Sequence, residues 1–70
     1  MHFEHEAKIA EAQNKLDNAL VRQKDAILFE INNGEYSKAQ MHLDLVRDLW
    51  NACNYGYKVL EIQKRITEKN

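Results

Sequence analysis

The sequence predicts an all-α fold, a single antiparallel two-helix hairpin that associates with a partner helix or dimerises. Proline is absent from the 70 residues, and the only glycines are Gly34 and Gly56. Apolar residues recur every three or four positions on both sides of Gly34, the spacing of helices with one buried face. Asn33 and Gly34 tolerate the left-handed backbone conformation that ends a helix. We expect a single domain over residues 1–70, with helices at about 4–32 and 38–67 and a turn at 33–37.

The residues after the turn carry signals for the start of the second helix. Ser37, with Gln40 three residues later, fits a capping box. Tyr36 and Met41 occupy the two positions of a hydrophobic staple around that cap. We therefore expect the second helix to begin directly after Ser37.

The predicted second helix carries two apolar stripes, although a helix in an isolated hairpin has only one face to bury. The first stripe consists of Ala39, Leu43, Val46, Trp50, Cys53, Tyr57 and Leu60. The second stripe, about 120° around the helix, consists of Leu45, Leu49, Ala52, Gly56, Val59 and Ile66. Antiparallel pairing places the first stripe opposite the apolar residues of helix 1, which are Ile9, Leu16, Leu20, Ile27 and Ile31. We therefore expect the first stripe to form the core, with Trp50 opposite Leu20.

The second stripe is left over by this pairing, and we predict that it binds a protein partner. It lies on the same side as three alanines of the first helix that recur every seven residues, Ala12, Ala19 and Ala26. Small residues there would let another helix approach closely. Val21 and Leu28 form a smaller apolar edge on the other side of the first helix. The alternative for both sets is a scatter of surface apolar residues, which is common in proteins.

Neither the composition nor any motif points to catalysis or to nucleic acid. The net charge is −1, and acids alternate with bases along the chain, so no strong field favours phosphate. His2 and His5 lie one turn apart without a third ligand, so we expect no metal site. Cys53 has no basic neighbour at helical spacing, which predicts an inert thiol. We expect a protein that is not an enzyme and that has no cofactor and no small-molecule substrate.

The sequence also favours a cytoplasmic location. The N-terminal stretch lacks the basic start and apolar run of a secretory signal. No segment approaches the roughly 20 apolar residues that a membrane span needs. A single cysteine suits a reducing compartment.

Three stretches of the chain are similar to a known family. They are Leu16-Asp-Asn-Ala19-Leu20, the polar turn that contains Gly34, and Tyr55-Gly-Tyr57-Lys-Val-Leu60. In these stretches and in its length, the chain resembles the small cytoplasmic co-chaperones of the type III secretion needle subunit. The resemblance implies a helical hairpin that binds a larger tetratricopeptide-like chaperone and helps to keep the needle subunit monomeric before export. Gly56 and the histidine-bearing N-terminus do not match the family pattern.

A second hypothesis needs no resemblance. Two hairpins could pair their second stripes in a homodimeric four-helix bundle, as in regulatory or adaptor proteins of plasmid or phage type. RNA binding by such a dimer would require a basic face without interleaved acids, which this sequence lacks.

Overall fold

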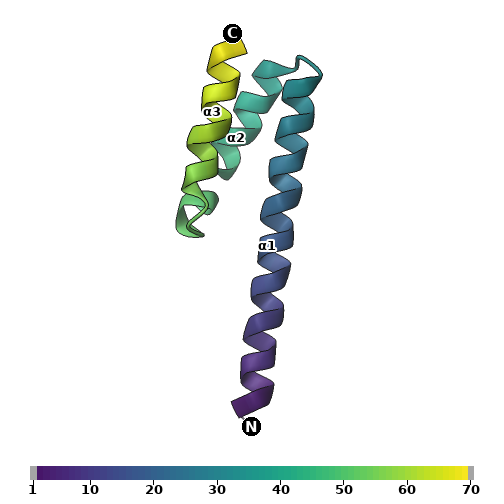
Figure 1. Ribbon diagram of the computed structural model, residues 1–70, viewed down its shortest axis with the longest axis vertical. Helices are drawn as coiled ribbons and strands as arrows, with labels where there is room; N and C mark the ends of the chain where they lie inside the picture. Colours follow the sequence, from purple (N-terminus) through teal and green to yellow (C-terminus); the bar gives the residue numbers. More distant parts are fainter. Residues whose placement is uncertain (1, 70) are drawn as a thin grey trace.

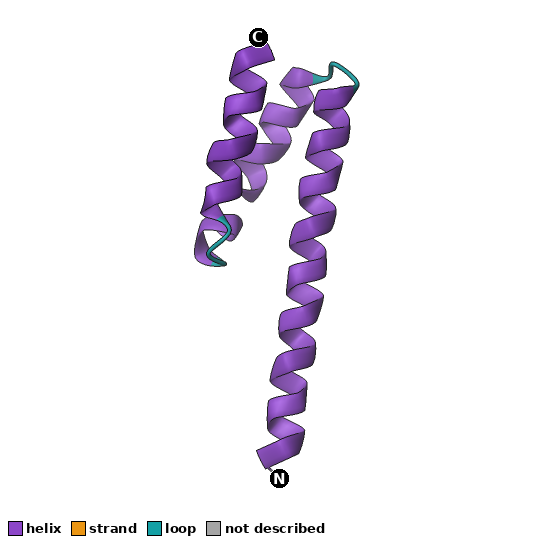
Figure 2. Cartoon of the chain, in the orientation of Figure 1, coloured by secondary structure: helices purple, strands orange, loops and turns teal. Residues whose placement is uncertain are grey.

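The computed structural model describes residues 2–69, including the side chains of residues 5–68, and this part of the chain is helical apart from two turns (Figure 2). The helices are α1 (His2–Asn32), α2 (Tyr36–Ala52) and α3 (Gly56–Lys69). The all-α prediction is confirmed. The two-helix hairpin needs correction, because the predicted second helix is divided into α2 and α3.

The end of α1 has the geometry that was predicted from Gly34. The backbone of Gly34 is left-handed, with φ +76°. The Gly34 N–H donates to the Ile31 carbonyl at 3.0 Å, and the Glu35 N–H donates to the Glu30 carbonyl at 2.8 Å. These two bonds form a Schellman motif, which pairs carbonyl groups that the helix itself leaves unpaired. The sequence therefore located this turn correctly.

The start of α2 differs from the prediction by two residues. The helix begins at Tyr36, its N-cap residue is Glu35, and no side chain bonds to the first turn. Ser37 therefore lies inside the first turn, where it cannot act as the cap. The capping box of Ser37 and Gln40 is not formed, and Met41 is 66% exposed.

A second Schellman motif separates α2 from α3. Asn54 has φ 59°, so it takes the left-handed role that Gly34 has in the first turn. The Tyr55 N–H donates to the Trp50 carbonyl at 2.7 Å. The rings of Trp50 and Tyr55 meet edge to face, with centroids 5.1 Å apart. This aromatic contact is the hydrophobic contact that often accompanies the motif.

Because of this turn, α3 folds back along α2 and does not continue along α1 (Figure 1). A reciprocal amide pair joins the two shorter helices. Gln40 Nε2 donates to Gln63 Oε1 and Gln63 Nε2 donates to Gln40 Oε1, both at 2.7 Å. Gln63, which interrupts the second stripe in the sequence, thus satisfies its amide within the α2–α3 contact.

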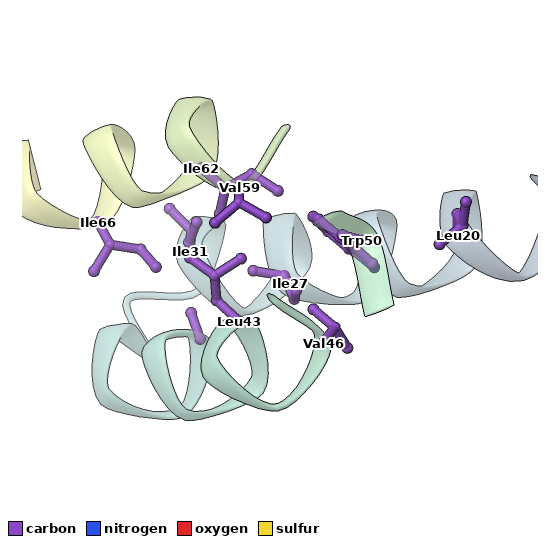
Figure 3. Close-up of a cluster of buried hydrophobic side chains, with 10 residues drawn as sticks. Leu20, Ile27, Ile31, Leu43, Val46, Trp50, Val59, Ile62 and Ile66 are labelled. Carbon is purple, nitrogen blue, oxygen red and sulfur yellow. The ribbon is translucent and has the colours of Figure 1, made fainter. Parts of the chain in front are cut away.

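The core lies where α2 and α3 meet the C-terminal half of α1 (Figure 3). Its buried side chains come from all three helices: Leu20, Ile27, Ile31, Ala39, Leu43, Val46, Trp50, Val59, Ile62 and Ile66. Trp50 is fully buried, and its Nε1 donates to Gln23 Oε1 of α1 at 2.8 Å. The prediction that the Trp50 stripe forms the core is confirmed for its α2 residues.

Beyond Cys53, the two predicted stripes exchange their roles. Tyr57 and Leu60, expected in the core, are 60% and 75% exposed. Val59 and Ile66, expected on the open face, are 6% and 1% exposed. The left-handed Asn54 interrupts the regular rotation of 100° per residue. A residue of α3 therefore does not lie on the face of α2 that the three-and-four spacing of the sequence assigns to it.

The N-terminal half of α1 projects beyond the other two helices (Figure 1). The molecule measures 53 × 19 × 15 Å, and its radius of gyration is 14.9 Å. A compact chain of this length would have a radius of gyration of about 11 Å. Ile9 and Leu16 are 47% and 41% exposed, so the first stripe does not bury these two residues as expected.

Candidate partner-binding surface

The outer side of α2 carries an exposed apolar row. Leu45 and Leu49 are 81% and 44% exposed, and Ala52 beside them is exposed. The three residues follow His42 at intervals of three, four and three positions, so they share its side of the helix. This part of the predicted binding stripe is therefore open to solvent.

Two polar contacts define which side of α1 faces α2. His42 Nδ1 lies 3.0 Å from Glu30 Oε1, and Gln23 accepts the indole N–H of Trp50 at 2.8 Å. Ala26 lies three residues after Gln23 and four before Glu30, and Ala19 lies four before Gln23. Both alanines therefore share the face of α1 that borders α2.

The two rows form one surface, which we call the α1–α2 face. It consists of Ala12, Ala19 and Ala26 on α1 and Leu45, Leu49 and Ala52 on α2, all of them exposed. These are six of the nine residues that the sequence assigned to partner binding. Ala12 lies on the projecting half of α1, so the face continues past the end of the core.

The contact between His42 and Glu30 lies beside this face. Glu30 is 8% exposed and is the buried charged residue of the core region, while His42 is half-buried. The short contact satisfies a carboxylate that would otherwise be buried without a partner, at considerable cost. The contact also joins α1 to α2 next to two residues of the α1–α2 face. Leu45 lies three residues after His42 on α2, and Ala26 lies four residues before Glu30 on α1. Sequence analysis missed this pair, because a contact across twelve residues leaves no helical spacing in the sequence.

The other three predicted binding residues do not lie on the face. Val59 and Ile66 are buried in the chain's own core, so they are not open to a partner. Gly56 is the first residue of α3, and a Cβ at this position would collide with the side chain of Asn51. The predicted second stripe is therefore not one continuous binding surface. Only its first three residues, Leu45, Leu49 and Ala52, lie on the α1–α2 face.

The smaller apolar edge on α1 is only partly open. Val21 is 43% exposed, but Leu28 is half-buried and packs against the core.

A separate open pocket of 430 Å³ lies between α2 and α3 and is lined by Arg47, Asn51, Gly56, Val59, Leu60 and Gln63. The guanidinium of Arg47 in this pocket donates to Asp44 and to Gln63 of the same chain. It is therefore already paired within the protein.

Metal-binding and reactive groups are dispersed over the described residues. Among the side chains that the structure describes, His, Cys, Asp and Glu form no group of three that could hold a metal ion. His5 is exposed on the projecting half of α1, and the side chain of His2 lies outside the described set. Cys53 is half-buried at the C-terminal end of α2 and packs against the core.

Over the described residues, no helix has the length and apolar character of a membrane span.

Comparison of the chain with protein-family models, with curated proteins and with solved structures gave no match. Functional assignment therefore depends on the geometry of the α1–α2 face.

Proposed function

We propose that this chain is a cytoplasmic binding protein without catalytic activity, whose α1–α2 face receives a helix of a larger partner. The observation that carries the proposal is the surface itself. Six exposed residues that are all apolar and mostly small lie along two adjacent helices, and the chain's own core leaves them uncovered. Alanine side chains allow a partner helix to approach closely, while Leu45 and Leu49 supply apolar area to bury.

The projecting half of α1 supports the same role. A helix that protrudes alone for about four turns gains no stability from packing, and isolated helices of that length are marginal in water. A partner that covers Ala12 and Leu16 would stabilise this segment. Binding would then order the same residues that it contacts.

The partner class that we propose is a tetratricopeptide-like chaperone with its secretion needle subunit. This choice comes from the resemblance of the chain to type III secretion co-chaperones, which implies a role in keeping the subunit monomeric before export. The helical composition and the open face are compatible with such a role. The third helix is a departure from the simple hairpin that the resemblance implies.

The homodimeric alternative has lost the interface on which it depended. It required two copies to pair along the whole second stripe, but Val59 and Ile66 of that stripe are buried within the chain. Only the α2 portion remains available. We therefore favour a larger, different partner.

The decisive experiment replaces Leu49 with glutamate. Co-expression with the candidate chaperone and needle subunit, followed by co-purification, should show that Leu49→Glu weakens the complex. The expected loss is about two orders of magnitude in affinity, because an unpaired carboxylate would be buried at the contact.

Leu60→Glu is the matched control, since it makes the same chemical change at an exposed leucine on α3, away from the face. Circular dichroism establishes that both variants are folded. If folded Leu49→Glu binds as well as Leu60→Glu and the unmodified chain, the α1–α2 face is not the binding surface.

A further inference from the structure

A row of basic residues runs along one edge of the α1–α2 face. Lys8, Lys15 and Arg22 are all exposed, and each lies four residues before one of the alanines of the face. Residues four apart are neighbours on a helix surface, so each cation flanks an alanine on the side away from α2. Lys15 Nζ lies 3.4 Å from Glu11, but both side chains are well exposed, and such pairs contribute little.

The spacing gives the edge the layout of a coiled-coil contact. Ile9, Leu16 and Gln23 alternate with the three alanines at intervals of three and four, which are the a and d positions of a heptad. The basic row then occupies the g position of each heptad. In coiled coils the e and g positions determine which partner is accepted and in which orientation.

A second copy of the chain fits this edge poorly in either orientation. In an antiparallel pair, g positions face g positions, so Lys15 would meet Lys15 of the copy and Lys8 would meet its Arg22. In a parallel pair, g positions face e positions, which are Gln13, Leu20 and Ile27 in this chain, and Leu20 and Ile27 are buried in the core. Neither arrangement supplies a carboxylate to the basic row.

Resting on the proposed function, we infer that the occupant of the α1–α2 face is an amphipathic helix of another protein, with large apolar residues opposite the alanines and Asp or Glu along the flank that meets Lys8, Lys15 and Arg22. The face from Ala12 to Ala26 spans 15 residues, or about 22 Å, which corresponds to about four turns of the bound helix. The acidic flank selects the partner, and the apolar contact provides most of the binding free energy.

Two matched synthetic peptides test the inference. Both have four heptads with leucine at a and d; one has glutamate at every e and g position, and the other has lysine there. Like charges discourage each peptide from pairing with itself. Fluorescence anisotropy of the labelled peptides against the full chain at low salt should give a Kd about tenfold lower for the glutamate peptide. The preference should shrink in 0.5 M salt, because exposed charges are screened.

Reversing the charge of the basic row tests whether these residues cause the preference for the glutamate peptide. The double variant Lys15→Glu/Arg22→Glu should prefer the lysine peptide, whereas Lys64→Glu/Arg65→Glu should keep the original preference. The second double variant makes the same change in net charge at exposed positions of α3.

The outcomes separate this inference from the proposed function. Equal binding of both peptides to the unmodified chain would overturn the acidic helix and leave the binding face intact. Binding of neither peptide would also overturn it, and the Leu49→Glu experiment would then decide the proposed function independently. A dimer of the chain alone that Leu49→Glu dissociates in sedimentation would overturn it in favour of a second copy.

Discussion

The two halves of α1 have similar apolar spacing but different surroundings. In the C-terminal half, Leu20, Ile27 and Ile31 are at most 6% exposed beneath α2 and α3. In the N-terminal half, Ile9 and Leu16 are more than 40% exposed, and this half of α1 projects beyond the other helices (Figure 1). The cause lies outside α1. A continuous second helix would have covered residues 3–13 with residues 57–67, but the turn at Asn54 sends that segment back along α2.

This difference shows that an apolar stripe identifies the face to be covered, but not the segment that covers it. In the C-terminal half the covering segments belong to the chain. In the N-terminal half we propose that a partner supplies the cover. Four measurements would sharpen or break the distinction between the packed and the projecting half.

The largest effect is expected for Trp50→Ala in the packed half. Trp50 is fully buried, and its removal should cost about 3–5 kcal/mol through a cavity and the loss of its bond to Gln23. A 70-residue domain has about that much net stability, so the free chain should unfold. Thermal unfolding followed by circular dichroism measures this. A cooperative transition with nearly unchanged midpoint would contradict the packing of α2 on α1.

The second measurement compares equivalent truncations in the two halves of α1. Ile27→Ala should lower the free energy of unfolding by about 2–5 kcal/mol, because Ile27 is fully buried. Leu16→Ala should lower it by less than about 1 kcal/mol, because Leu16 is already 41% exposed. Urea denaturation gives both values. Equal losses would mean that the N-terminal half is packed in the free chain.

The third measurement tests the turn that creates the difference. Because Asn54 is left-handed, Asn54→Ala should destabilise by about 1 kcal/mol, whereas Asn54→Gly should be neutral or slightly stabilising. A continuous helix predicts the opposite order, since alanine favours helix interiors and glycine disfavours them by about 1 kcal/mol. The sign of the difference between the two variants in chemical denaturation therefore decides between a turn and a continuous helix.

The smallest effect is expected from removing residues 1–13. The described side chains of this segment, those of residues 5–13, are all exposed and contribute nothing to the buried core, so the free energy of unfolding should change by no more than about 0.5 kcal/mol. Partner binding should weaken, because Ala12 is lost from the α1–α2 face. Urea denaturation and the co-purification assay measure the two properties separately. A large loss of stability would place a covering segment over the N-terminal half.

Local signals in the sequence were sufficient for the first part of the fold. Gly34 in a polar turn located the end of α1 and the reversal of the chain. The spacing of Ala39, Leu43, Val46 and Trp50 identified the buried face of α2, since a helical face is set by the 100° rotation per residue and needs no knowledge of the partner. The same rule placed Leu45 and Leu49 on the outside.

The second turn had only weak local signals. Asn54 can adopt the left-handed conformation, and Gly56 two residues later disfavours a helix interior, but each preference is worth about 1 kcal/mol or less. The apolar spacing continued across the turn without interruption, so periodicity alone favoured a continuous helix. For the same reason Ile62 was absent from both predicted stripes, although it is buried in the core.

Sequence alone therefore determined that this protein is helical, where its first reversal lies, and which side of α2 faces α1. The tertiary structure decided that the chain reverses again at Asn54. Folding back buries Val59, Ile62 and Ile66 and forms the Gln40–Gln63 pair, whereas a continuous helix would have set Tyr57 and Leu60 against the N-terminal half of α1. The choice depends on the difference between two sets of long-range contacts. The local preferences of Asn54 and Gly56 favour the same turn but are too small to decide it alone, and the turn leaves half of α1 uncovered.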